Sequence, residues 1–106
     1  MKGGLGGLIK QAQVMKLKVE QLQARLAEER FEAEAGEAEA GGVVRVTVSG
    51  RQQLLALRID PDLGRDPALL EDLLLTAVNR ALADSRARSE REMAALTGGA
   101  NLPFAL

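Results

Sequence analysis

The stretch GGVVRVTVSGRQQLLALRID, residues 41–60, alternates apolar and polar side chains in two runs separated by a short polar segment. Alternation with a period of two is typical of strands that are buried on one face. The expected core-face residues are Val44, Val46, Val48, Leu55, Leu57 and Ile59. The glycine pair at 41–42 and the sequence SGRQ at 49–52 suit tight turns. Residues 41–60 therefore predict two neighbouring strands of an antiparallel meander.

A further strand is expected immediately upstream, in FEAEAGEAEA at residues 31–40. Phe31, Ala33 and Ala35 alternate with glutamates, and Gly36 then shifts the phase so that the alanines at 38 and 40 would continue the inner face. A phase shift at a glycine indicates a β-bulge. Residues 31–60 are thus predicted to form a three-stranded antiparallel sheet.

Residues 8–30 are predicted to form a helix, which follows a flexible, glycine-rich arm at 1–7. Apolar residues recur there at alternating steps of three and four: Leu5, Leu8, Ala12, Met15, Val19, Leu22 and Leu26. A seam of this kind packs either on the chain's own core or against another helix in a coiled coil. Val14 and Leu17 lie on the opposite side of the helix, which indicates a second contact, either with the other helix of this chain or with a partner subunit. They are the candidate dimer contacts.

A second helix is predicted over residues 67–96, with Asp66 as its N-cap and Pro67 at its first position. Its first half carries an apolar stripe: Leu70, Leu73, Leu74, Ala77, Val78 and Ala81. The same stripe continues with polar residues only: Asp84, Ser85, Arg88 and Glu92. We therefore expect the first half to pack on the sheet and the second half to project from the body or to run along a partner. Residues 97–106 are expected to form a loose tail.

Composition argues against catalysis and against cofactors. The 106-residue chain has no cysteine and no histidine, which removes thiol nucleophiles, histidine bases and most zinc or haem sites. The opening glycines do not form a nucleotide-binding P-loop, because Leu8 and Ile9 intervene before Lys10 and no hydroxyl residue follows it. The aspartates at 60, 62 and 66 are better explained by turn and cap roles than by a metal site. We expect no enzyme, no cofactor and no small-molecule substrate.

Although the net charge is only −1, basic and acidic residues are concentrated in different parts of the chain. Residues 1–19 carry four lysines and no acid, whereas residues 28–39 carry six glutamates and a single arginine. The candidate DNA-binding residues are Lys2, Lys10, Lys16, Lys18, Arg80, Arg86, Arg88 and Arg91. A soluble, charged helix is the alternative explanation for the four arginines. The chain has no apolar run long enough to span a membrane and no signal peptide pattern, so we expect no membrane partner.

Four stretches in this order resemble the YbaB/EbfC family of bacterial nucleoid-associated proteins: GGLGGLIKQAQVMKLKVEQLQ, GGVVRVTVSGRQQLLALRIDP, LLEDLLLTAVNRAL and MAALTGGANLPF. The resemblance covers nearly the whole chain. Its most specific parts are the strand–turn–strand that ends at Asp60–Pro61, the LEDL motif at 70–73 with Asn79 beyond it, and the segment 98–103.

The resemblance implies an α+β fold of helix, three-stranded antiparallel meander and helix, assembled as a tweezer-like homodimer. It also implies low-specificity binding of double-stranded DNA in the bacterial cytoplasm, at the nucleoid. The six glutamates between 28 and 39 depart from what a basic DNA binder would have. A protein–protein adaptor that works beside replication or recombination machinery is the alternative function.

Overall fold

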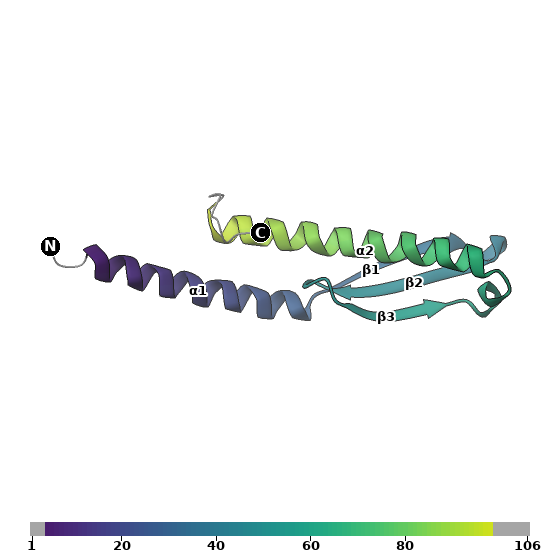
Figure 1. Ribbon diagram of the computed structural model, residues 1–106, viewed down its shortest axis with the longest axis horizontal. Helices are drawn as coiled ribbons and strands as arrows, with labels where there is room; N and C mark the ends of the chain where they lie inside the picture. The colour runs from purple at the N-terminus through teal and green to yellow at the C-terminus, as the bar shows by residue number, and fades with distance from the viewer. Residues whose placement is uncertain (1–3, 99–106) are drawn as a thin grey trace.

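A computed structural model describes residues 4–98 and shows a helix, a three-stranded sheet and a second helix in that order (Figure 1). Its elements are α1 (Gly4–Glu28), β1 (Arg30–Glu37), η1 (Ala38–Ala40), β2 (Gly42–Ser49), β3 (Leu54–Ile59), η2 (Pro61–Arg65) and α2 (Pro67–Leu96). The molecule is elongated, with extents of 73 × 21 × 17 Å. The predicted α+β class is confirmed.

The sheet is an antiparallel meander in the order β1-β2-β3. The β1–β2 register runs without a shift from Arg30 opposite Ser49 to Glu37 opposite Gly42. The predicted bulge at Gly36 is therefore wrong, and the alanines at 38 and 40 belong to η1 instead of extending the strand. Gly36 is needed for another reason, because it has a φ of +99° and a Cβ there would lie 2.4 Å from a backbone oxygen of Gly42.

The core lies between the sheet and the first half of α2. The predicted inner face of β2 is confirmed, since Val44, Val46 and Val48 are completely buried. Ala33 and Ala35 stand beside Val46 and Val44 on the same face of the sheet. Ala77 and Ala81 of α2 belong to the same core cluster, and all four alanines are buried. Short side chains on both surfaces let the helix approach the sheet closely. Asp66 caps this helix as predicted, because its side chain accepts a hydrogen bond from the Leu69 N–H.

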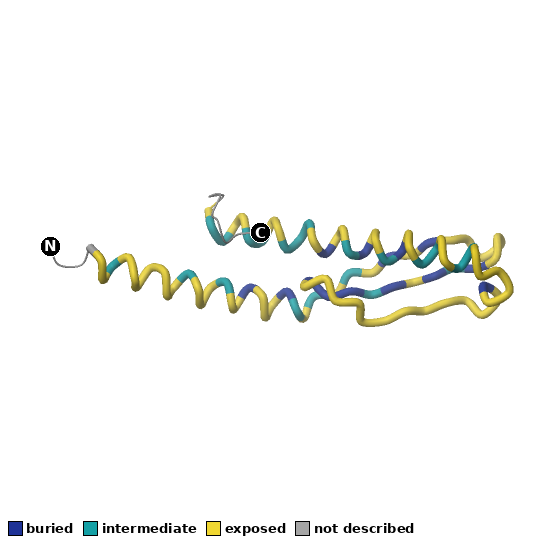
Figure 2. Tube along the Cα trace, viewed as in Figure 1, coloured by how far each residue is buried: buried dark blue, intermediate teal, exposed yellow. Residues whose placement is uncertain are grey.

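β3 departs from the expectation, because no residue of this strand is buried (Figure 2). Leu57 and Ile59 are 46% and 40% exposed, although they stand opposite Val46 and Val44 on the same side of the sheet as α2. The observed irregularity lies between Thr47 and Val48 of β2, where Leu54 instead of Leu55 takes the position opposite Val48. The prediction that Leu55, Leu57 and Ile59 are core residues of this chain is wrong.

The reason is the width of the covering helix. An α-helix with its side chains is about 10 Å across, whereas neighbouring strands are about 4.8 Å apart. One helix therefore covers two strands, and α2 lies over β1 and β2. The apolar side chains of β3 therefore lie beyond the edge of α2 and are not covered by it.

α1 is a long arm that touches the rest of the protein only near its C-terminal end (Figures 1 and 2). Leu22 and Leu26 are buried, and the Gly50 N–H donates a hydrogen bond to the Leu26 carbonyl at 2.9 Å. The helix begins at Gly4, so the described part of the predicted flexible arm is helical, despite the low helix propensity of its glycines. The remainder of that arm, residues 1–3, lies outside the described residues, as does 99–106 of the predicted tail.

The second half of α2 does not project freely, which corrects the expectation. Ser85 is completely buried, donates to the Ser49 carbonyl at 2.6 Å and accepts from Gln52 Nε2 at 3.0 Å. Arg88 lies 3.0 Å from a carboxylate oxygen of Glu29, at the junction of α1 and β1. The polar continuation of the α2 stripe thus packs on the turn between β2 and β3 and on the base of α1.

Candidate nucleic-acid interface

The lysines of α1 form the most exposed group of cations. Lys10, Lys16 and Lys18 are all exposed, and none forms a hydrogen bond or ion pair with another described residue. From Gly4 to Val19 the helix carries no acidic residue. This arm therefore presents uncompensated positive charge to solvent. Lys2, a further candidate, lies outside the described residues.

The four arginine candidates on α2 divide into two pairs. Arg86 and Arg91 are exposed and have no partner among residues 4–98. Arg80 donates to the backbone carbonyl of Glu34 at 2.8 Å, and Arg88 pairs with Glu29. In the Arg88–Glu29 ion pair, Arg88 Nε and Glu29 Oε2 are buried and lack hydrogen-bond partners. Arg80 and Arg88 are therefore committed to the fold, whereas Arg86 and Arg91 are available to a ligand.

The available cations do not share one face. At 3.6 residues per turn, Arg86 and Arg91 are about 140° apart around α2. Lys10, Lys16 and Lys18 likewise spread around α1, which has solvent on most of its circumference. A rigid, flat anionic ligand would contact only some of these five cations at the same time. A surface of this kind suits a long, repeating array of phosphates better than a single anionic ligand.

The glutamates of 28–39 lie mainly on the body, away from the tip of the α1 arm (Figure 1). Glu34 pairs with Arg45 of β2, with 2.6 Å between its oxygen and Nη2, and Glu29 pairs with Arg88. Glu37 and Glu39 belong to the end of β1 and to η1. The sequence segregation of charge thus becomes a spatial one, with an acidic body and a basic arm.

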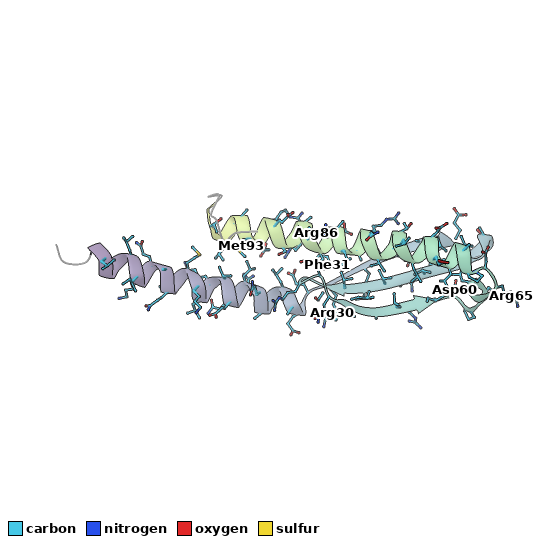
Figure 3. The ribbon with its side chains drawn as sticks, in the orientation of Figure 1. Arg30, Phe31, Asp60, Arg65, Arg86 and Met93 are labelled. Atoms are coloured by element: carbon cyan, nitrogen blue, oxygen red, sulfur yellow. The ribbon has the colours of Figure 1, made fainter. Side chains whose placement is uncertain are left out.

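Figure 3 shows the positions of cations that lie away from the arm tip. Arg65 lies at the end of the molecule opposite α1, in η2, and Arg30 lies where α1 joins the sheet. Arg30 donates to the carbonyls of Ala27 and Glu29, whereas Arg65 is exposed. Arg65 is therefore a suitable comparison for the α1 lysines.

An apolar groove of about 450 Å³ separates α2 from β3. Leu57, Leu74, Leu75 and Val78 line it, and Leu75 is 64% exposed. The sequence analysis does not predict this surface, because the predicted apolar stripe of α2 does not include Leu75. Three consecutive leucines at 73–75 were the available signal, since they widen the apolar face beyond one stripe.

The remaining candidates have structural roles. Asp60 Oδ2 accepts a hydrogen bond from the Val43 N–H at 2.8 Å, and Asp66 caps α2. Across residues 4–98 there is no group of three acidic, histidine or cysteine side chains that could hold a metal ion. Over the same residues, no helix combines the length and hydropathy that crossing a bilayer requires.

Comparison with known proteins shows the family and the fold of this chain. The model of the YbaB/EbfC DNA-binding family matches residues 1–100. A nucleoid-associated protein of Polynucleobacter necessarius subsp. necessarius is 43% identical over 103 residues, which cover 97% of this chain and 92% of that protein. A nucleoid-associated protein of Moorella thermoacetica is 45% identical, with 94% and 97% covered. A crystal structure of an uncharacterized protein from Helicobacter pylori shares the fold, with a TM-score of 0.70, 23% identity and coverage of 92% and 96%.

Proposed function

Because the chain belongs to the YbaB/EbfC DNA-binding family, we propose that it binds double-stranded DNA as a homodimer at the bacterial nucleoid. The observation that carries the proposal is the acid-free stretch of α1 from Gly4 to Val19, on which three lysines are exposed and have no partner among the described residues. Uncompensated lysines on a narrow rod gain free energy by displacing counterions from phosphates. Arg86 and Arg91 on α2 add to this set.

Low sequence specificity follows from the chemistry of these contacts. Lysine meets a phosphate as a point charge, and phosphate contacts carry no direct sequence information. The described part of the arm has no aromatic residue to insert between bases. We therefore propose binding that depends strongly on salt and weakly on base sequence.

The groove between α2 and β3 is the surface that we propose for the homodimer. Leu54, Leu55, Leu57 and Ile59 on β3 and Leu75 on α2 are each at least 40% exposed in the single chain. β3 also pairs with β2 along one edge only, so within the described sheet its other edge is open. An exposed apolar edge strand favours pairing with another chain. A second copy would cover this edge and the groove together.

Val14 and Leu17 remain proposed contacts of a different part of the dimer. They are 47% and 54% exposed on the far side of α1. They would meet a partner only if the two arms approach each other, whereas β3 would be covered in any dimer built on the sheet edge.

The test combines sizing with duplex binding. Sedimentation should give a dimer mass at micromolar concentration, and fluorescence anisotropy should give similar affinities for two duplexes of unrelated sequence. Changing Lys10 and Lys18 together to Ala should weaken both duplexes alike, whereas Arg65→Ala, at the opposite end, should change neither. If the lysine variant is a folded dimer with unchanged affinity at low salt, the arm does not bind DNA.

The second candidate, a protein–protein adaptor, is favoured by the exposed apolar residues of α1. Leu5 and Leu8 are 73% and 64% exposed, which phosphate binding alone does not explain. Binding to protein through this arm would depend much less on salt than binding to DNA.

A further inference from the structure

The apolar seam of α1 is only partly covered. At its C-terminal end Leu22 and Leu26 are buried. Met15 and Val19 are half-buried, and Ala12, Leu8 and Leu5 are exposed. A pocket of about 310 Å³, lined by Ala12, Met15, Lys16, Val19 and Glu20, opens on this stretch. We call the part from Leu5 to Val19 the open seam.

The e and g positions that flank this seam are basic or neutral, whereas Glu20 stands at the outer b position. In a heptad with Leu5, Ala12, Val19 and Leu26 at a and Leu8, Met15 and Leu22 at d, the flanking e and g positions hold Lys16, Lys18 and Arg25. The other flanking residues are Gly4, Ile9, Gln11 and Gln23, so that no flanking position is acidic. Charges at e and g select the partner helix in coiled coils.

The covered end of the seam shows which type of neighbour it accepts. α2 runs beside it in the opposite direction (Figure 1). Glu92 of α2 lies 3.8 Å from Arg25, a flanking cation, and also 4.0 Å from Arg88. Apolar burial at the seam is thus accompanied by a carboxylate that meets the basic flank. The open seam continues the same surface with Lys16 and Lys18 in place of Arg25.

We infer that the open seam is a docking site for an acidic amphipathic helix of a partner protein. Such a helix would bury Leu5, Leu8 and Met15 and would place carboxylates beside Lys16 and Lys18. At 1.5 Å per residue the open seam is about 22 Å long, enough for about four turns of a partner helix. This site is independent of the groove at β3.

Other occupants fit less well. An antiparallel α1 from a second copy would bring lysines against lysines at the flanks, and like charges there are destabilising. Duplex DNA would neutralise Lys16 and Lys18 but would leave Leu5 and Leu8 in water. Because the proposed helix and DNA would share these lysines, their binding should be mutually exclusive at the arm.

The test uses designed peptides on the full chain. The acid peptide has three heptads with Leu at a and d and Glu at e and g, and the base peptide has Lys at e and g. By fluorescence anisotropy we expect the acid peptide to bind about tenfold more tightly than the base peptide. Lys16→Glu with Lys18→Glu should reverse that preference. Leu8→Asp should weaken the acid peptide about tenfold, whereas Gln13→Asp, an exposed change on the far side of the helix, should have little effect.

Three results of the peptide assay would each overturn the inference: equal binding of the two peptides, no binding of either, or unchanged binding to Leu8→Asp. A Leu8→Asp variant that sediments as a folded monomer when the parent is a dimer would also overturn it, because the occupant would then be a second copy. Circular dichroism verifies the fold of each variant. Failure of duplex binding leaves these outcomes unaffected, since no DNA is present in the peptide assay.

Discussion

The salt dependence of duplex binding follows from which cations the fold leaves free. Five candidates per chain have no partner among the described residues: Lys10, Lys16, Lys18, Arg86 and Arg91. In a homodimer this set doubles to ten. Because the side chains surround both helices, we take half of them to reach phosphates together. About five contacts give a log-affinity against log-salt slope of about −4.5 and a loss of about 500-fold between 50 and 200 mM salt.

The measured salt slope distinguishes a site with five acting cations per chain from a site with all eight. If all eight sequence candidates acted, the same reasoning would give about eight contacts and a slope of about −7. That result would require Arg80 to leave the Glu34 carbonyl and Arg88 to leave Glu29, so it would refute the assignment of these two residues to the fold.

The assay is fluorescence anisotropy of a labelled duplex at four or more salt concentrations. The double change of Lys10 and Lys18 to Ala removes four cations from the dimer, hence about two contacts, and should reduce the slope to about −2.7. A parent slope between zero and −1, or a double variant with the parent slope, would show that phosphate contacts by the arm do not drive binding.

Three further predictions concern the framework and the assembly. Ser85→Ala should lower the free energy of unfolding by about 0.5–1.5 kcal/mol in urea denaturation, because the Ser49 carbonyl loses one of its two donors and keeps only the Gln52 N–H. Gly50→Ala should cost about 1–3 kcal/mol in the same assay and should loosen the base of the arm, because its Cβ would lie 2.4 Å from the Leu26 carbonyl oxygen. Leu75→Asp should convert the proposed dimer to a folded monomer in sedimentation, since Leu75 is exposed in the single chain; a dimer of unchanged stability would exclude the groove as the interface.

The architecture was predictable because each element has its own periodicity and terminal signals. The valines of β2 alternate with polar residues and are buried as expected. Asp66 and Pro67 mark the start of α2, where the structure places it. These are local signals, which depend on residues a few positions apart. The helix over Gly4–Gly7 was missed because glycine disfavours helices in isolation, and the helical residues that follow outweigh that cost.

The exposure of β3 was not predictable from its own pattern. Leu57 and Ile59 would alternate in the same way whether α2 or another chain covered them. The exposure of β3 is decided by how many strands a single helix can cover, and that depends on the tertiary arrangement. The alternation correctly indicates a face to be buried, and the structure shows that this chain does not bury it.

The prediction of the candidate site from sequence was incomplete for the same reason, because it also depends on the tertiary arrangement. Sequence reasoning counts cations, but it does not reveal which of them have intramolecular partners. Arg88 finds Glu29 across 59 residues and Arg80 finds the Glu34 carbonyl across 46. These pairings also change the meaning of the acidic segment, because Glu29 and Glu34 are engaged with arginines of the body. Glu29 thus helps to fix α2 against the base of α1, and Glu34 pairs with β2. The lysines Lys10, Lys16 and Lys18 of the arm have no such partner among the described residues.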